Sequence, residues 1–233
     1  MFRILYVLCI VFDERYLIYN IHTKYHNKNN LNNQLRRITL MKNDITANEY
    51  QGMSINNQHG GCDVNILNRL FDINEYVSDK RKRICFTVLT FTFPADNYYS
   101  DQNNLFVGFL DSFITHLRRK GLDPQYLWAR ELKDDNYHSH YHLALWTDGY
   151  KDRCIYDSYL LARTLWCKRL LIPESDGYVH YNKSTPQLHL DSNNPDYTEK
   201  YQEMVYWGSY LCKCEQKGNL TEHHRNWSSS RLC

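Results

Sequence analysis

The segment HSHYHLALW at residues 138–146 places three histidines at alternate positions and then continues into apolar residues. Successive side chains of a β-strand point to opposite faces, so His138, His140 and His142 share one face of such a strand. The residues between them share the other face with the aliphatic positions that follow. The segment therefore predicts a strand with one histidine-bearing face and one face that packs against a helix.

Two further strands are predicted beside it. The segment ICFTVLTFTFP at 84–94 is β-branched and aromatic, ends at a proline and contains few polar residues, which favours a central strand. The segment QYLWARE at 125–131 forms a second strand, joined to the histidine strand by a short polar connection. Between the two, apolar residues at helical spacing predict a helix that Asn104 caps and Gly121 closes.

The remaining segments complete the element order. A second helix is predicted over 156–172, before Pro173, and the short segments GYVHYN and QLHL are strand candidates. Asp196 and Glu199 have the spacing of a capping box for a last helix, which is expected to run through Lys217 and stop at Gly218. The resulting order of strand, helix, strand, strand, helix, strand and helix predicts an α+β fold with an antiparallel sheet.

Composition and charge set the frame for this domain. Residues 1–64 are expected to form an N-terminal apolar segment and a polar linker, and 65–233 the main domain. The first apolar stretch is shorter than the ~20 residues that a membrane span needs. Eight scattered cysteines favour a reducing cytoplasm. A net charge of +2 excludes a protein that coats DNA through charge alone, so any nucleic-acid site must be local.

The histidine strand also predicts a metal site. Alternate residues lie about 6.6 Å apart along a strand, so two same-face imidazoles reach one ion whereas three do not. Tyr141 suits the packed face better than Ser139, which selects His140 and His142 as ligands and leaves His138 on the substrate side. Glu131, at the end of the neighbouring strand, is the candidate oxygen ligand. This donor set indicates Mg²⁺ or Mn²⁺, and Mn²⁺ tolerates nitrogen ligands better.

A stripe of tyrosines and lysines marks the last helix. Steps of three and four place Tyr206, Tyr210, Lys213 and Lys217 on one helical face, with apolar residues on another. A phenol with a pKa near 10 needs a nearby cation and a polarised phosphate before it attacks a phosphodiester. Lys213, one turn beyond Tyr210, is the candidate cation.

The motifs LTFTFP, WARE, HYHLALW and SYLCK occur here in this order. Their arrangement resembles the HUH endonucleases that start rolling-circle replication, and more closely the inovirus (filamentous-phage) replication proteins and the prophage-borne YagK/YfjJ-type domains. FLDSF at 109–113 stands where those proteins have a similar helical motif. The resemblance covers roughly residues 65–232 and implies a ferredoxin- or RRM-like sheet of about five strands.

The resemblance also implies an activity. A divalent metal on His140 and His142 would polarise the scissile phosphate, and a tyrosine would attack it to leave a 5′-phosphotyrosine link and a free 3′-OH. Tyr210 matches the tyrosine of the family, and Tyr206 fits the second tyrosine of the two-tyrosine initiators. The expected partners are single-stranded DNA or an origin hairpin, with a host helicase and polymerase, in the cytoplasm of a bacterial host.

Two other functions remain open from the sequence. Cys212, Cys214, His223 and His224 offer thiolates and imidazoles for zinc, although a C-x-C pair on a helix points its two sulfurs apart. Alternatively, the aromatic sheet binds single-stranded nucleic acid by stacking without cleaving it.

Overall fold

The computed structural model describes residues 44–58, 60–99, 102–132, 139–183, 187–214 and 225–232. Ile45–Cys233 forms one compact unit, and the fold below is that of this unit. The predicted domain boundary after residue 64 stays a prediction, and the apolar N-terminal segment lies outside the described residues.

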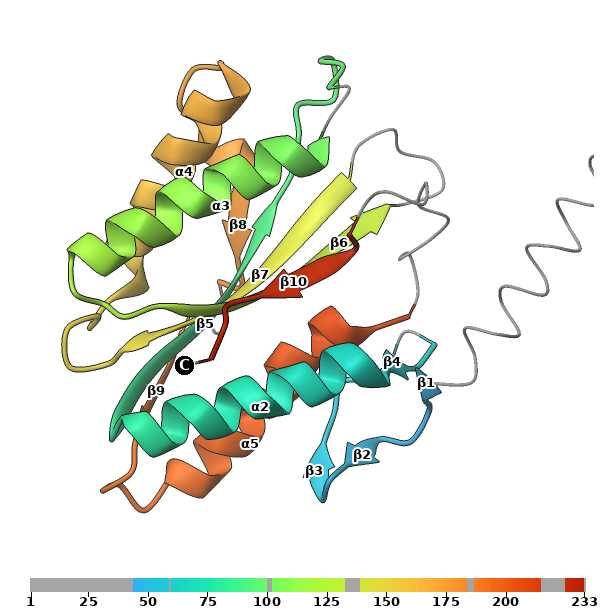
Figure 1. The fold of residues 1–233 in the computed structure, drawn as a ribbon, viewed down its shortest axis with the longest axis vertical. Coiled ribbons are helices and arrows are strands. Elements are labelled where there is room, and N and C mark those ends of the chain that lie inside the picture. Colours follow the sequence, from blue (N-terminus) through green and yellow to red (C-terminus); the bar gives the residue numbers. More distant parts are fainter. Residues whose placement is uncertain are drawn as a thin grey trace, which may run out of the picture. The chain divides into compact units, whose positions relative to one another are not determined.

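The centre of the unit is a six-stranded antiparallel sheet (Figure 1). Its strands follow the order β10-β6-β7-β5-β8, and β9 also pairs with β5. Their bounds are Arg83–Phe91 (β5), Gln125–Leu132 (β6), Ser139–Asp148 (β7), Val179–Tyr181 (β8), Leu188–Asp191 (β9) and Trp227–Ser229 (β10). The predicted α+β class and antiparallel sheet are confirmed, with β10 as a strand beyond the expected five.

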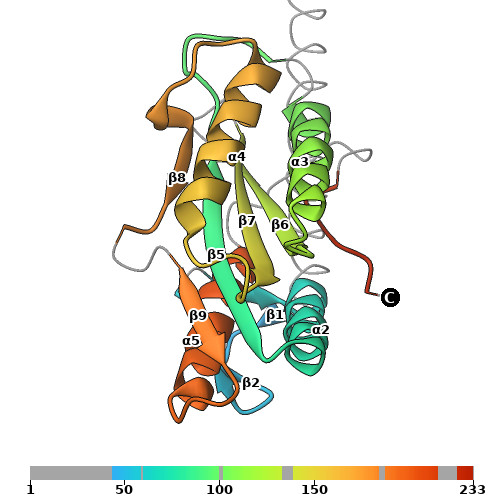
Figure 2. The ribbon, with the colours of Figure 1, turned by 90° about the vertical axis from the view of Figure 1, so that its left-hand side faces the viewer.

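Four helices in the described part of the chain cover both faces of this sheet (Figures 1 and 2). Helices α3 and α4 pack on one face, and α2 and α5 on the other. They span Val64–Lys80 (α2), Gln102–Arg119 (α3), Ile155–Leu170 (α4) and Tyr197–Ser209 (α5). The smaller elements are β1 (Asp44–Ile45), β2 (Glu49–Tyr50), β3 (Met53–Ser54), β4 (Cys62–Asp63), η2 (Asp176–Tyr178) and η3 (Tyr210–Cys212).

Strand β7 separates two hydrophobic cores because its side chains alternate. Tyr141 and Leu143 are fully buried on the side of α3 and α4, where the Tyr141 ring stacks on Phe106 with centroids 4.1 Å apart. Ala144 and Trp146 are fully buried on the side of α2 and α5. The prediction that the residues between the histidines face a packed helix is confirmed.

Two predicted helix starts are wrong in detail. Helix α3 begins at Gln102, so Asn104 lies inside it rather than capping it. Asp196 precedes α5, but its side chain makes no capping hydrogen bond and instead pairs with Lys200 at 3.0 Å. The predicted end of α3 is confirmed, because Gly121 has a φ of +73° and its amide donates to the Arg118 carbonyl.

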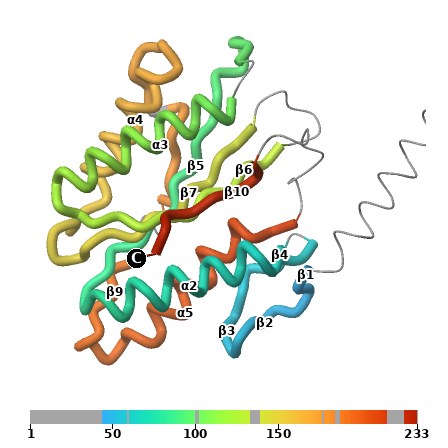
Figure 3. Tube along the Cα trace, in the orientation of Figure 1, coloured from blue at the N-terminus to red at the C-terminus, as the bar shows by residue number. Residues whose placement is uncertain are grey.

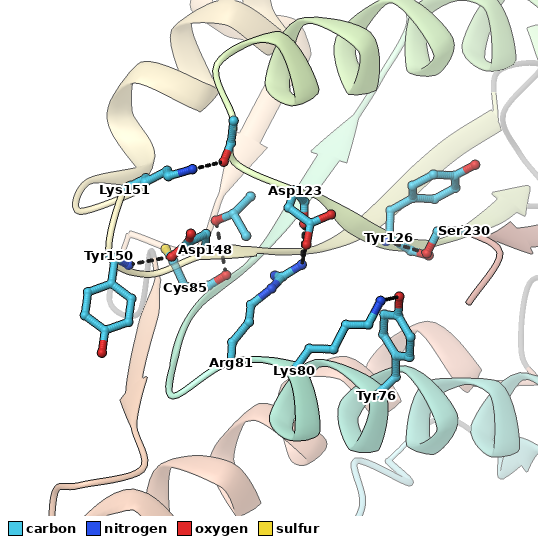
Figure 4. Close-up of polar contacts among 12 residues, drawn as sticks. Tyr76, Lys80, Arg81, Cys85, Asp123, Tyr126, Asp148, Tyr150, Lys151 and Ser230 are labelled. Carbon is cyan, nitrogen blue, oxygen red and sulfur yellow. Dashed lines mark hydrogen bonds and ion pairs between the residues drawn. The ribbon is translucent and has the colours of Figure 1, made fainter. Parts of the chain in front are cut away.

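Polar contacts tie the elements together at the end of the sheet where β5 begins and β7 ends (Figure 4). Arg81 pairs with Asp123 at 2.6 Å, and the Lys151 ammonium donates to the Gly121 carbonyl at 2.9 Å (Figure 4). The Tyr150 amide donates to the Asp148 carboxylate at 2.9 Å and closes the turn after β7. These contacts leave the opposite end of the sheet, where Thr90 pairs with His142, for other interactions.

The last strand is held on the sheet by a side chain from α2. Strand β10 lies alongside β6 (Figure 3), and Trp227 pairs with Ala129. Arg69 donates from Nε to the Ser229 hydroxyl at 2.7 Å and from Nη2 to the Ser230 carbonyl at 2.6 Å. Across the described residues, no helix combines the length and the apolar character needed to traverse a bilayer.

No helix was predicted at Val64–Lys80, although Ile66, Leu70, Ile73 and Val77 recur there at helical spacing and are all fully buried. The Asp63 carboxylate caps α2 by accepting from the amides of the second and third helical residues. This helix supports the sheet face that carries His140 and His142.

One buried hydrogen bond links α2 to the centre of the sheet and can be tested. Asn74, fully buried in α2, accepts a hydrogen bond from the Trp146 indole nitrogen at 3.0 Å. We expect Asn74→Ala to lower the free energy of unfolding by about 1–3 kcal/mol, because the buried indole N–H loses its acceptor. Urea unfolding measures this. The control Asn65→Ala, at an exposed position of the same helix, should change stability by less than ~0.5 kcal/mol.

Candidate active site

One row of paired residues crosses the sheet at the end where β7 begins. The register places Trp227, Ala129, His142, Thr90 and His180 opposite one another on β10, β6, β7, β5 and β8. Directly paired residues point to the same face, so this row lies on the side of α2 and α5. The next row towards the start of β7 that shares this face pairs His140 with Glu131. The predicted ligands therefore share one face of the sheet.

Both nitrogens of the His142 ring have partners. Nδ1 lies 2.9 Å from the Thr90 hydroxyl, and Nε2 lies 3.0 Å from Oε2 of Glu131. His142 is 7% exposed and Glu131 3% exposed, so water contributes little to this contact. When Nδ1–H donates to Thr90, the lone pair of Nε2 points towards the carboxylate side. Such an arrangement fixes the orientation of the ring, as in metal-ligating histidines.

Lys213 joins the carboxylate to the tyrosine. Its ammonium lies 2.9 Å from Oε2 of Glu131 and donates a hydrogen bond to the Tyr210 hydroxyl at 2.8 Å. Lys213 is only 4% exposed, which is rare for a lysine and requires a paired charge. The three side chains and His142 thus form one buried polar cluster.

The backbone that delivers Tyr210 and Lys213 is not the predicted continuous helix. Helix α5 ends at Ser209, Tyr210–Cys212 forms the short 3₁₀ helix η3, and Lys213 is extended with ψ 139°. Lys213 forms a β-bridge with Cys62, and the Cys214 amide donates to the Gly61 carbonyl at 2.9 Å. These contacts, which lie far away in sequence, end the helix and turn the lysine towards Glu131. Lys217 lies outside the described residues.

The 3₁₀ geometry explains why the phenol and the ammonium meet. Side chains three residues apart eclipse each other in a 3₁₀ helix, and Tyr210 and Lys213 have this spacing. The ammonium also lies 4.2 Å from the centre of the Tyr210 ring. The same ring meets His142 edge-on, with centroids 5.2 Å apart. Tyr210 is therefore held between the cation and the imidazole.

The charges in this cluster reinforce one another. Burial alone would raise the pKa of Glu131, but the hydrogen bond and charge of His142, together with Lys213, outweigh it and lower the pKa. Burial alone would lower the pKa of Lys213, but its contacts with Tyr210 and Glu131 raise it. Glu131 is consequently an anion and Lys213 a cation at neutral pH. A phenolate beside such a cation is stabilised relative to the neutral phenol.

Tyr206 occupies a different place. It lies one turn earlier in α5, is half-buried, and its ring meets the edge of Trp207 with centroids 6.0 Å apart. The structure therefore brings Tyr210, rather than Tyr206, against His142. The roles of the two tyrosines stay predictions.

The remaining predicted ligand, His140, is half-exposed opposite Glu131 on the same face. Within the described residues, no three His, Cys, Asp or Glu side chains are gathered closely enough to hold a metal ion. One observation fits an ion nonetheless: Oε1 of Glu131 is buried without a hydrogen-bond partner in the described part of the chain. A carboxylate oxygen in this position is a suitable ligand for a divalent cation. His138 lies outside the described residues.

Two neighbouring residues were not predicted. Thr90 orients His142, and its position among the alternating threonines of LTFTFP was the available signal, since polar residues on one face of an apolar strand mark that face. His180 is exposed at the far end of the same row, and only the strand register reveals it.

The predicted zinc site is only partly described. Cys212 is fully buried in η3 and Cys214 is half-exposed, whereas His223 and His224 lie outside the described residues. The cysteines of the described part of the chain are free thiols.

The fold and the cluster define an α+β protein that presents a tyrosine, an ammonium, a carboxylate and an imidazole on one face of an antiparallel sheet. Residues 85–219 match the family of the replication-associated protein ORF2, and the chain belongs to this family. The match includes β5 to β9, α5 and the polar cluster. The expectation of a replication-associated protein is confirmed at this level. No curated protein and no solved structure matches the chain.

The buried ion pair provides a stability test. We expect Lys213→Met to lower the free energy of unfolding by about 3–5 kcal/mol, because it leaves the Glu131 carboxylate buried without a countercharge. The double variant Lys213→Met/Glu131→Leu should recover at least half of this loss, since both charges are then removed. Lys200→Met, which breaks the exposed pair with Asp196, serves as the control and should cost at most ~1 kcal/mol. Urea unfolding of the four proteins measures these differences.

Proposed function

We propose that this protein nicks and rejoins single-stranded DNA at a replication origin through a covalent 5′-phosphotyrosine intermediate. The observation that carries the proposal is the position of the Tyr210 hydroxyl, 2.8 Å from a buried ammonium, with its ring against His142. A phenol needs a cation and an electrophilic phosphate to act as a nucleophile, and this cluster provides the cation. Membership of a replication-associated family supports the same conclusion.

The proposed site takes a divalent metal on His142, Glu131 and His140. Nε2 of His142 and Oε2 of Glu131 are 3.0 Å apart, about the separation of two adjacent ligands in an octahedral shell with bonds near 2.1 Å. Imidazole in the donor set favours Mn²⁺ over Mg²⁺. The ion, when bound, supplies polarisation of a phosphate oxygen. His140 completes the set from the same face, on the row that it shares with Glu131.

The residues of the chain perform the remaining steps of the proposed reaction. The Tyr210 oxygen loses its proton and forms a bond to phosphorus, while the bond from phosphorus to the 3′ oxygen breaks. The 3′ oxygen takes up a proton and leaves as a hydroxyl, which a polymerase can extend. Lys213 holds the phenolate in place through its hydrogen bond, and Glu131 holds Lys213. Tyr206 is the candidate second nucleophile for strand transfer.

The proposal places the protein with the HUH endonucleases, in the company of inovirus and YagK/YfjJ-type initiators. It assigns DNA unwinding to a host helicase and extension of the free 3′-OH to a host polymerase, in the bacterial cytoplasm. The competing function is binding of single-stranded DNA without cleavage. The formation of a covalent adduct separates the two.

We expect Tyr210→Phe to abolish the covalent protein–DNA adduct while leaving DNA affinity within about twofold, because only the nucleophilic oxygen is removed. Incubation with a labelled origin hairpin and Mn²⁺, followed by denaturing electrophoresis, measures the adduct. Tyr206→Phe is the matched comparison from the preceding helical turn. A full adduct yield in Tyr210→Phe contradicts the assignment, and loss of the adduct only in Tyr206→Phe exchanges the two roles.

The metal ligands are tested by two variants of one contact. We expect His142→Ala to lose Mn²⁺-dependent cleavage, because the ring that faces Glu131 is removed. Thr90→Val, which removes only the hydroxyl that orients Nδ1, should weaken Mn²⁺ binding by about 10–100-fold. Calorimetric titration with Mn²⁺ measures binding independently of cleavage. Parent-like Mn²⁺ affinity in both variants would show that the ion, if bound, sits elsewhere.

A further inference from the structure

A hollow lies beside the polar cluster, at the place where two short strands share the edge of β5. Strand β9 pairs with Arg83–Phe86, and β8 pairs with Leu89–Phe91, so Thr87 and Val88 fall between them. The hollow has a volume of about 270 Å³. It is lined by Phe86, Thr87, Val88, Asn182, Gln187, Leu188 and Trp207.

The hollow opens on the same face of the sheet as His142. Val88 pairs with Ala144 and Thr90 pairs with His142, so Val88 and Thr90 point to one face. The two are alternate residues of β5 and lie about 6.6 Å apart. Because Thr90 contacts the His142 ring, a ligand in the hollow lies one residue pair away from the proposed metal ligand. A polymer bound at His142 therefore reaches the hollow within about one nucleotide, as the backbone of a single DNA strand repeats every few ångströms.

The lining of the hollow suits a flat, uncharged ring. Phe86, Val88 and Leu188 provide apolar surface from the sheet, and Trp207 provides an aromatic wall from α5. The Trp207 indole nitrogen donates to Glu203 at 3.2 Å, which holds the ring in one orientation. None of the described lining residues is charged. Pockets for drug-sized ligands occupy roughly 300–1,000 Å³, so this smaller hollow fits one ring system rather than a whole cofactor.

The polar groups of the lining lie at its rim. Gln187 is held by the start of α4, because its side-chain oxygen accepts from the Ile155 amide, and it forms a fixed wall. Asn182 follows His180 on the site face of β8, since alternate residues share a face and His180 pairs with Thr90. An amide at this place matches the donors and acceptors of a base edge, and the exposed His180 lies between it and the cluster.

We propose that the hollow between Trp207 and the edge of β5 binds the base of a nucleotide next to the scissile phosphate. The indole stacks on the base, and the amide of Asn182 faces its edge. The inference rests on the proposed function, because it takes single-stranded DNA as the substrate. It adds a subsite that positions the strand without contacting the reacting atoms.

The test measures binding of a fluorescein-labelled 20-nucleotide oligothymidylate by anisotropy, with an abasic oligomer of the same length as the second probe. We expect Trp207→Ala to weaken oligothymidylate binding by about 5- to 100-fold, since one stacked base is lost. Binding of the abasic oligomer should change by less than twofold. Trp207→Phe, which keeps an aromatic ring, should retain most of the affinity, and Tyr150→Ala, at the opposite end of the sheet, should match the parent.

A second variant guards against a Trp207→Ala protein that folds poorly. Val88→Phe fills the hollow from the strand while keeping a residue that favours β-structure, and it should weaken oligothymidylate binding to a similar degree. Parent-like oligothymidylate affinity in either Trp207→Ala or Val88→Phe overturns the subsite. An equal loss for the abasic oligomer also overturns it, because the effect would then be on the backbone path rather than on a base.

The adduct assay keeps this result separate from the proposed nicking. If the parent forms no adduct but Trp207→Ala still selectively weakens oligothymidylate binding, the subsite stands and the nicking reaction does not. If the parent forms the adduct and both pocket variants bind like the parent, the nicking reaction stands and the subsite is wrong.

Discussion

The buried ion pair between Glu131 and Lys213 holds the functional face of this protein together. It joins the end of β6 to the segment after α5, two parts of the chain that have no local connection. Taking two such charges out of water costs several kcal/mol per ion, so their mutual attraction and their further hydrogen bonds must offset this cost. His142 and Tyr210 supply those bonds. The contact that neutralises the lysine is therefore also the contact that places the tyrosine.

The two faces of the sheet serve different purposes. The face under α3 and α4 is filled by aromatic packing around Tyr141, Phe106 and Trp166. The face under α2 and α5 is apolar only at the end where Trp146 lies, and it becomes polar at His142 and Glu131. The alternation of residues along β7 thus separates stability from the proposed chemistry. It also explains why a strand can carry a buried histidine beside a fully packed tyrosine.

Local sequence patterns were sufficient for most of the sheet and for the helices on one side. Strands β5, β6 and β7 and the closure at Gly121 follow from alternation, a proline and a glycine, all of which act within a few residues. The end of α5 could not be predicted in this way. It depends on the bridge from Lys213 to Cys62 and on the pair with Glu131, both of which require the folded chain.

The same distinction applies to the candidate site. Spacing alone selected Glu131, His142, Tyr210 and Lys213, and the structure brings these four together. Thr90 and His180 were not found, because they belong to the site only through strand register. Asp196 and Glu199 show the opposite case, a local motif whose capping bond gives way to an ion pair with Lys200. Residue spacing therefore identified chemical groups better than it identified their supports.

The strand at the C-terminal end of the described chain has a consequence for the behaviour of the protein in solution. By covering β6, and by its attachment to Arg69, β10 occupies backbone groups that would otherwise offer a template for a strand from another molecule. On the other side, β8 and β9 divide the border of β5 into two short pieces, which make a poor template for intermolecular pairing. A sheet so rich in aromatic and β-branched residues is in this way protected from edge-to-edge aggregation.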